Sequence, residues 1–172
     1  MAISLYDLCV PAYLQTLGGV AGFLDKGRAF CAEKGIDPES IVDSKLADDM
    51  LPFRFQVVAS AHHSLGAVNG VKAGLFEPPG ASTLDYAGLQ KLVADAIAAL
   101  KAVTPAELNA CEGKDMAFQM RGMKIPFVAE GFIQSFSLPN FYFHATTAYD
   151  ILRSKGAPLG KRDFLGQMRI KS

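Results

Sequence analysis

The feature that most constrains the fold is a nearly heptad repeat of apolar residues in the middle of the chain. It places apolar side chains at i, i+3, i+7, i+10, i+11 and i+14, the spacing of one face of an α-helix. Such a face has to be buried against other helices. The repeat therefore predicts a helix that opens at Ser82 or Thr83, ends at Thr104-Pro105 and packs in a bundle. Its members are Tyr86, Leu89, Val93, Ala96, Ile97 and Leu100.

The N-terminal stretch predicts another long helix, over residues 4–34. Ser4 is a candidate N-cap, and Lys34 followed by Gly35 is a typical helix end. Within this helix, the adjacent glycines Gly18 and Gly19 either bend it or let a neighbour come close.

Two further helices complete the set. The first runs from about residue 51 to residue 73, and its apolar residues on more than one side predict contact with several neighbours. The second is predicted to start at the cap Ser137, tolerates Pro139 in its first turn and closes at Gly156.

The period changes from helical to alternating in the segment MAFQMRGMKIPF, residues 116–127. A fold at Arg121-Gly122 pairs Met120 with Met123 on one face, which predicts a short β-hairpin lying on the bundle. Residues 76–83, FEPPGAST, are predicted to form a loop. Four long amphipathic helices with one hairpin predict an all-α fold, a helix bundle with crossovers.

Length and charge limit the function classes. The 172 residues are predicted to form a single domain, residues 1–172, because a chain of this length buries roughly 70% of its unfolded surface. Seventeen basic residues balance seventeen acidic ones, which predicts no nucleic-acid partner and no anionic membrane surface. No apolar run approaches the ~20 residues of a membrane span.

Cysteine usage predicts a cytoplasmic protein. Cys9 and Cys31 lie in one predicted helix, about 33 Å apart at ~1.5 Å per residue, so they cannot form a disulfide. With Cys111 the count is odd, which is typical of a reducing compartment. The start MAISLYDLC also lacks the pattern of a secretion signal.

Three motifs give the chain a family resemblance: LPNFYFHATTAYDILR at 138–153, APLGKRDFLG at 157–166 and LPFRFQVVASAHHS at 51–64. The chain resembles an uncharacterised bacterial domain-of-unknown-function family related to the DinB-like four-helix-bundle proteins. The resemblance implies an up-down-down-up bundle, often a homodimer, with a pocket between helices. In the DinB-like group this pocket often holds a divalent metal on three histidines, and some members are thiol transferases, isomerases or hydrolases.

The resemblance implies metal-ligand roles for two histidines. His63, or its neighbour His62, matches the ligand of the second helix in chain order, predicted over residues 51–73. His144 matches the first ligand of the fourth helix, predicted from Ser137 to Gly156. The position four residues further on holds Ala148, which cannot bind a metal. The three-histidine site is therefore incomplete.

The residues themselves favour His63 over His62, because a helical wheel places His63 on a stripe of small and polar residues that leaves room around its ring. His144 lies at the flank of an apolar face and is either a ligand or a core-edge histidine with a structural hydrogen bond. A third ligand could come from Asn140 or Glu130. Zinc, nickel, manganese and iron are the metals considered, and a site without metal is the alternative.

Two functional hypotheses follow. One is a DinB-like bundle protein with a degenerate metal or small-molecule pocket between the second and fourth helices, whose activity would be that of a metal-dependent hydrolase or transferase. The other is a non-catalytic, homodimeric protein that binds a ligand or serves as a scaffold.

Phe143 is a large ring on a polar side of its helix. Its position predicts that the hairpin, the C-terminal tail or a second subunit covers it.

Overall fold

The longest helix forms where the N-terminal pattern predicts it. The computed structural model describes residues 3–171, and helix α1 runs over Leu5–Lys34. The Ser4 side chain accepts a hydrogen bond from the Asp7 backbone N–H at 3.1 Å, which caps the first turn. Gly35 ends the helix in the left-handed conformation with φ 65°, which glycine adopts at low cost. Both predicted ends are confirmed.

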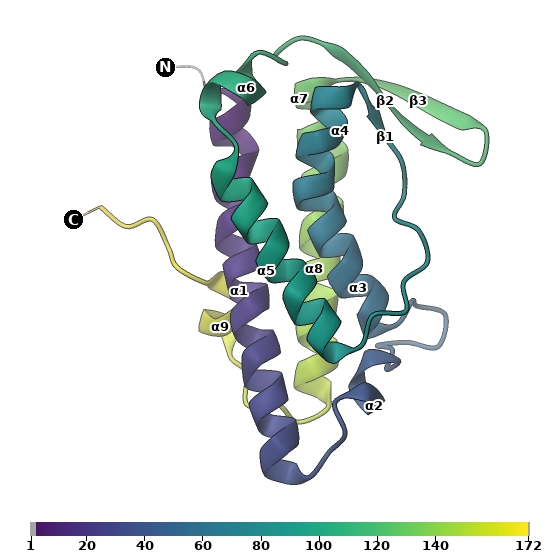
Figure 1. Ribbon diagram of the computed structural model, residues 1–172, viewed down its shortest axis with the longest axis vertical. Helices are drawn as coiled ribbons and strands as arrows, with labels where there is room; N and C mark the ends of the chain where they lie inside the picture. The colour runs from purple at the N-terminus through teal and green to yellow at the C-terminus, as the bar shows by residue number, and fades with distance from the viewer. Residues whose placement is uncertain (1–2, 172) are drawn as a thin grey trace.

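Three other long rods pack beside α1 (Figure 1). The second rod is α3 (Phe53–Ala61), the π-helical turn η1 (His62–Gly66) and α4 (Ala67–Ala73) in succession. The third is α5 (Tyr86–Ala102). The fourth is α7 (Ala129–Phe132), the π-helical turn η2 (Ile133–Ser137) and α8 (Leu138–Ser154). Short helices α2 (Glu39–Val42), α6 (Pro105–Asn109) and α9 (Lys161–Leu165) lie in the connections and the tail.

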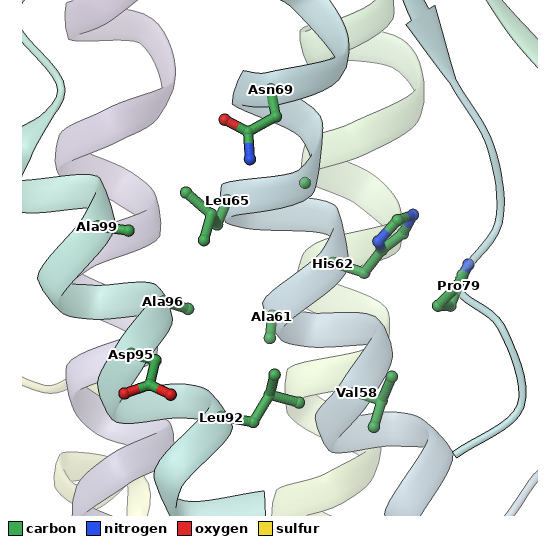
Figure 2. Close-up of a pocket in the computed structure, with 11 residues that line it drawn as sticks. Val58, Ala61, His62, Leu65, Asn69, Pro79, Leu92, Asp95, Ala96 and Ala99 are labelled. Atoms are coloured by element: carbon green, nitrogen blue, oxygen red, sulfur yellow. The ribbon is translucent and has the colours of Figure 1, made fainter.

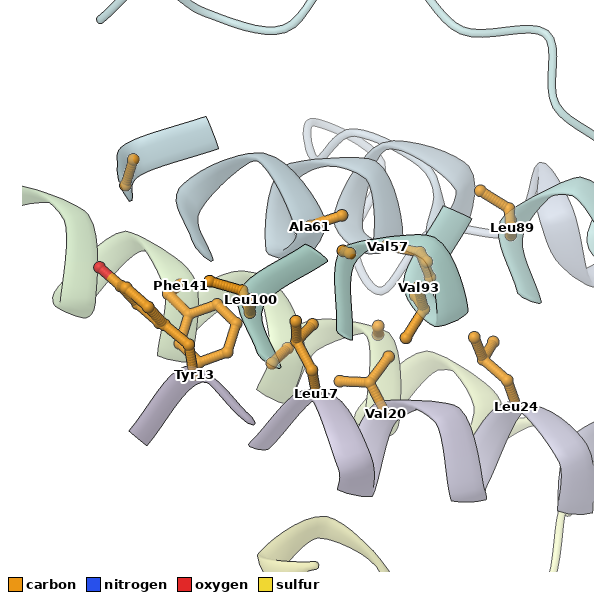
Figure 3. Close-up of a cluster of buried hydrophobic side chains, with 14 of the residues drawn as sticks. Tyr13, Leu17, Val20, Leu24, Val57, Ala61, Leu89, Val93, Leu100 and Phe141 are labelled. Carbon is orange, nitrogen blue, oxygen red and sulfur yellow. The ribbon is translucent and has the colours of Figure 1, made fainter. Parts of the chain in front are cut away.

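The core lies between these rods, where the predicted apolar faces meet (Figure 3). The heptad-like stripe of α5 is buried against α1 and α3, as its spacing predicts, except for the half-buried Ile97. Tyr13 and Phe141 meet edge to face, with ring centroids 5.0 Å apart, and join α1 to α8. The core side chains in view include Leu17, Val20, Leu24, Val57, Ala61, Leu89, Val93 and Leu100.

A three-stranded sheet lies at one end of the bundle. Strands β2 (Asp115–Met120) and β3 (Met123–Val128) form the predicted hairpin, and Met120 pairs with Met123. Arg121 and Gly122 both have positive φ, 47° and 82°, which suits a two-residue hairpin turn. The third strand, β1 (Leu75–Phe76), pairs parallel with β2. The all-α prediction with one hairpin therefore lacked a strand, because this two-residue pairing of backbone groups leaves no alternating pattern in the sequence.

Two predicted helix starts are wrong. The third helix begins at Tyr86, where Asp85 accepts from the Gly88 N–H at 2.7 Å, and not at Ser82 or Thr83. The fourth rod begins at Ala129, and Ser137 has helical angles inside it (φ −67°, ψ −51°). A serine shortly before Pro139 resembles the start of a helix, but here α8 continues directly from the π-helical turn η2.

The C-terminal tail docks on α1 through α9. Gln15 donates its side-chain N–H to the Leu165 carbonyl at 3.0 Å, and Lys26 pairs with Asp163. A Cβ on Gly19 would collide with the Phe164 carbonyl, so this glycine lets the tail backbone come close. The close approach is confirmed for Gly19, whereas Gly18 has open space around it.

The structure also bears on the cysteines and on membrane crossing. Cys9, Cys31 and Cys111 are all buried free thiols, so the predicted absence of a disulfide between Cys9 and Cys31 is confirmed. Within residues 3–171, no helix combines the length and the apolar character that crossing a bilayer requires.

Candidate functional site

Two π-helical turns lie next to the candidate residues His63 and His144, and a hydrogen bond joins the two turns. Turn η1 carries His63 and turn η2 ends at Ser137, and each interrupts an otherwise α-helical rod. A π-helical turn inserts a residue into the helix, shifts the faces of the turns beyond it and frees backbone carbonyls. Ser64 donates its hydroxyl to carbonyls of the preceding turn at 2.9 Å, so side chains satisfy part of this irregular backbone.

A buried hydroxyl chain ties the two turns to α1. Ser137 Oγ donates to the His63 carbonyl oxygen at 2.6 Å, and Tyr13 Oη lies 2.8 Å from Ser137 Oγ. Because the serine proton goes to a carbonyl, which only accepts, the tyrosine must be the donor of the second bond. Burial raises the pKa of Tyr13 well above its ordinary value, so this donor keeps its proton.

The structure brings the His63 and His144 rings together. Their centroids are 5.7 Å apart and their planes are inclined by 21°, a stacked arrangement. His63 comes from η1 and His144 from α8, which are neighbours in the bundle. The two histidines that the sequence analysis selected therefore lie side by side.

Hydrogen bonds fix the tautomer of His144. Its Nδ1 lies 2.8 Å from Gln56 Oε1, while Gln56 Nε2 donates to the Leu51 carbonyl at 2.8 Å. The second bond fixes which end of the amide is oxygen, and an amide oxygen only accepts. His144 Nδ1 therefore carries the proton, and its Nε2 is left with a lone pair. Gln56 as this partner was missed, although it lies on the same predicted stripe as His63.

His63 is held less completely. Its Nδ1 is the one buried side-chain nitrogen or oxygen within residues 3–171 that has no hydrogen-bond partner. An unpaired buried polar atom costs about 1–3 kcal/mol and calls for an explanation, such as a bound ion or water.

Burial keeps both rings neutral at physiological pH. It lowers the pKa of His63 to about 3, with smaller contributions from the neighbouring His144 and His62 rings. It also lowers the pKa of His144 to about 4. Rings with such pKa values are poor general acids or bases near pH 7, but their lone pairs are available without competition from protons.

His62 points away from the pair. Its Nε2 lies 2.6 Å from the Glu77 carbonyl oxygen, so Nε2 carries the proton. The ring faces the loop after β1 near Pro79 (Figure 2). The preference for His63 over His62 as the partner of His144 agrees with this arrangement.

The two candidate third ligands, Asn140 and Glu130, differ in their distance from the histidine pair. Asn140 is one turn before His144, and its amide nitrogen donates to the Phe136 carbonyl at 2.7 Å. Glu130 is fourteen residues before His144, roughly 20 Å along the helix, and accepts from the Gly113 N–H at 2.9 Å. The structure therefore does not bring Glu130 to the pair. No group of three histidine, cysteine, aspartate or glutamate side chains able to hold a metal occurs among the described residues.

Aromatic rings surround the pair. Phe76 from β1 and Phe136 from η2 lie 5.2 and 5.7 Å from the His63 ring, between centroids. Phe55 and Phe143 lie 5.6 and 5.2 Å from the His144 ring. Phe143 is 55% exposed, so neither the hairpin nor the tail covers it fully.

Comparisons with known proteins give a family and a fold relative. The family model described as "Domain of unknown function (DUF1993)" matches residues 5–165. The chain is similar to the solved structure of a DinB family member protein from Shewanella denitrificans at 28% identity, with a TM-score of 0.84. The match covers 98% of this chain and 95% of that one. No curated protein matches the chain.

Proposed function

Because this chain belongs to the DUF1993 family of uncharacterised domains, we propose from its site that it is a DinB-like bundle protein whose His63 and His144 together bind a divalent transition-metal ion. The proposal includes the up-down-down-up order of the four rods, which is consistent with the path of the chain in Figure 1. Zinc, nickel, manganese and iron are the ions to test.

The observation that carries the proposal is the fixed tautomer of His144. A metal-binding histidine typically donates its other ring N–H to an oxygen acceptor, which orients the ring and raises the basicity of the binding nitrogen. The Nδ1–H bond to Gln56 is an arrangement of this kind, and it leaves Nε2 as the available donor. The lowered pKa values of both rings also favour metal binding, because only a neutral imidazole is a ligand.

The donor types fit a transition metal, but their number is smaller than in a typical catalytic zinc centre. Such a centre uses three protein ligands, and the described residues offer two imidazoles, with Ala148 buried at the position of the third. An ion bound here would supply Lewis acidity, with its remaining positions left to water or a small molecule.

The ring spacing is compatible with a shared ion. With metal–nitrogen distances of about 2.0–2.1 Å, two imidazoles on one ion have ring centres at most roughly 6.5 Å apart. The observed 5.7 Å lies within that limit. Stacked rings direct their in-plane lone pairs past each other, so one ring has to turn. His144 is held by Gln56, so the ring free to turn is His63, whose Nδ1 has no partner.

The second candidate function is metal-free binding of a small molecule, and the aromatic surroundings of His144 favour it. Phe55 and Phe143 flank the His144 ring edge to face, and its Nε2 would accept a hydrogen bond from a hydroxyl or amine. This reading corresponds to the non-catalytic, homodimeric alternative, in which a second subunit covers the exposed Phe143.

Metal titration of tag-free protein tests the proposal. Calorimetry with each of the four ions, together with elemental analysis after dialysis, is expected to give one ion per chain. His63→Ala and His144→Ala should each weaken binding at least tenfold while the helical circular dichroism is retained. The matched control is His62→Gln, which changes the adjacent histidine but keeps a donor for the Glu77 carbonyl, and it should bind like the wild type.

The outcome separates the two candidates. If none of the four ions binds stoichiometrically, or if His62→Gln weakens binding as much as His63→Ala, the metal proposal fails. The metal-free reading then predicts that the His144 ring resonances respond to small molecules bearing N–H or O–H donors.

A further inference from the structure

A cavity lies between the rods formed by α3 with η1 and by α5, on the side of η1 that carries His62 (Figure 2). Its volume is about 410 Å³, within the roughly 300–1,000 Å³ of small-molecule pockets. The walls are mostly apolar, and Asp95 is the only charged residue that lines them. Their apolar members include Val58, Ala61, Leu65, Leu92, Ala96 and Ala99.

The cavity forms where small side chains of α3, η1 and α5 meet, at a contact that larger side chains would otherwise fill. Ala61 on α3 and Ala96 on α5 face each other across the gap, and Gly66 in η1 adds no side chain (Figure 2). Packed helices normally fill such a contact with larger side chains. Beside Ala61 and Ala96, the contact between α3 and α5 therefore leaves space that larger side chains would fill.

The loop after β1 forms an outer wall. Two anchors hold it: the His62 Nε2–H bond to the Glu77 carbonyl at 2.6 Å and the Arg54 Nε–H bond to the Leu84 carbonyl at 2.8 Å. Two further hollows, of about 240 and 550 Å³, continue under this loop and share Val58 and Pro79 with the cavity. The available space is therefore elongated along α3.

His62 gives this cavity its polar anchor. Because Nε2 donates to the Glu77 carbonyl, a neutral His62 has its lone pair on Nδ1. Nδ1 lies over Gly66, where a Cβ would come within 2.9 Å of it, and it accepts no hydrogen bond from the described residues. Unlike His63 Nδ1, this nitrogen is not sealed in the core, so it is open to a ligand.

We propose that this cavity binds a neutral, elongated apolar molecule whose single N–H or O–H group donates to His62 Nδ1. An anionic ligand is disfavoured because no cationic side chain lines the cavity, and Asp95 is already paired with Lys91 at 2.6 Å. The inference does not depend on the His63–His144 pair, which lies on another side of η1.

Two probes that differ by one donor test the proposal. N-phenyl-1-naphthylamine is a neutral aromatic body with one N–H, and 1-phenylnaphthalene lacks that group. The full chain is expected to bind both saturably at one site per chain, with the amine bound more tightly. His62→Gln keeps a donor for the Glu77 carbonyl but removes the lone pair at Nδ1, so it should weaken the amine about threefold to tenfold and leave the hydrocarbon unchanged.

Adjacent alanines on α5 provide a matched pair of variants. Ala99 and Ala98 are both exposed, but only Ala99 lines the cavity. Successive residues of a helix point about 100° apart, so a tryptophan at 98 faces elsewhere. Ala99→Trp should weaken both probes at least tenfold, and Ala98→Trp should leave both unchanged.

Three results overturn the proposal. They are the lack of saturable probe binding, equal effects of the two tryptophan variants, and equal effects of His62→Gln on the two probes. Sedimentation adds a fourth: a wild-type dimer that Ala99→Trp dissociates would make the groove a subunit interface instead of a ligand site. His63→Ala should not change probe affinity, so failure here stays distinct from failure of the metal proposal.

Discussion

Ser137 Oγ lies 2.6 Å from the carbonyl oxygen of His63, 74 residues away in the sequence. This bond joins the π-helical turns η1 and η2 of two rods, and Tyr13 from α1 donates to the same hydroxyl. The position of His63 against α8 therefore depends on a buried polar chain as well as on apolar packing.

Removing the Ser137 hydroxyl is expected to destabilise the protein. Ser137→Ala leaves the Tyr13 hydroxyl and the His63 carbonyl unpaired in the core, so the free energy of unfolding should fall by about 1–3 kcal/mol. The control is Ser135→Ala in the same turn, whose exposed hydroxyl bonds the Gly131 carbonyl and which should change stability by less than about 0.5 kcal/mol. Urea unfolding measures both, and equal losses would contradict the special role of Ser137.

Gln56 is expected to act as a positioning residue for His144. Gln56→Met removes the acceptor of the Nδ1–H bond at similar side-chain size, so it should weaken metal binding about 10- to 100-fold. The ¹⁵N resonances of the His144 ring should show loss of the single Nδ1–H tautomer. Gln56→Glu keeps an oxygen acceptor, so it should retain both the metal affinity and the single Nδ1–H tautomer. Unchanged ring resonances in Gln56→Met would count against this role.

Asn140 tests whether the pair has a third protein ligand. Its amide nitrogen bonds the Phe136 carbonyl, so Asn140→Ala should cost about 1 kcal/mol of stability and leave the metal affinity as it was. Calorimetry and urea unfolding of the same preparation give both quantities. A tenfold loss of affinity without a loss of stability would instead make Asn140 a ligand, as one of the sequence alternatives holds.

Acid is expected to weaken the fold in a defined window. The pKa values of His63 and His144, about 3 and about 4, lie below the 6.5 of an exposed histidine. Between pH 6.5 and about 4, the unfolded chain therefore binds protons that the folded chain does not, and the free energy of unfolding falls as the pH drops. Above pH 6.5 the two rings add no slope.

Urea midpoints between about pH 7.5 and 4.5 measure this slope before the carboxylates titrate. The double variant His63→Asn/His144→Gln should have a flatter profile than the wild type. Identical profiles would mean that the two rings titrate normally in the folded protein.

The glycine pair in α1 predicts opposite effects at adjacent positions. Gly19→Ala places a methyl group against the Phe164 carbonyl and should displace α9, with faster proteolysis of the tail. A Cβ added at Gly18 would meet no atom within 4 Å, so Gly18→Ala should stabilise the helix by about 0.5–1 kcal/mol. Thermal unfolding and limited proteolysis compare the two. If they behave alike, the tail does not rest on Gly19.

The sequence predicted the elements that have a strong local signal. The helix over 4–34 ends where Ser4 and Gly35 place its caps, and the hairpin turns at Arg121-Gly122, because capping and turn conformations depend on a few adjacent residues. Strand β1 and the start of the fourth rod were missed. A two-residue strand has no period, and a π-helical turn lets a helix continue through residues that resemble a start.

The sequence by itself determined four amphipathic rods and the side of each that is buried, since apolar spacing at the helical period fixes a face before any partner is known. Its resemblance to the DinB-like group pointed to His63 and His144, and the helical wheel favoured His63 over His62. Only the tertiary structure decided that Gln56 fixes the His144 tautomer and that His63 Nδ1 is left unpaired. The orientation and protonation of a buried ring depend on contacts between residues far apart in the chain, and no local pattern records them.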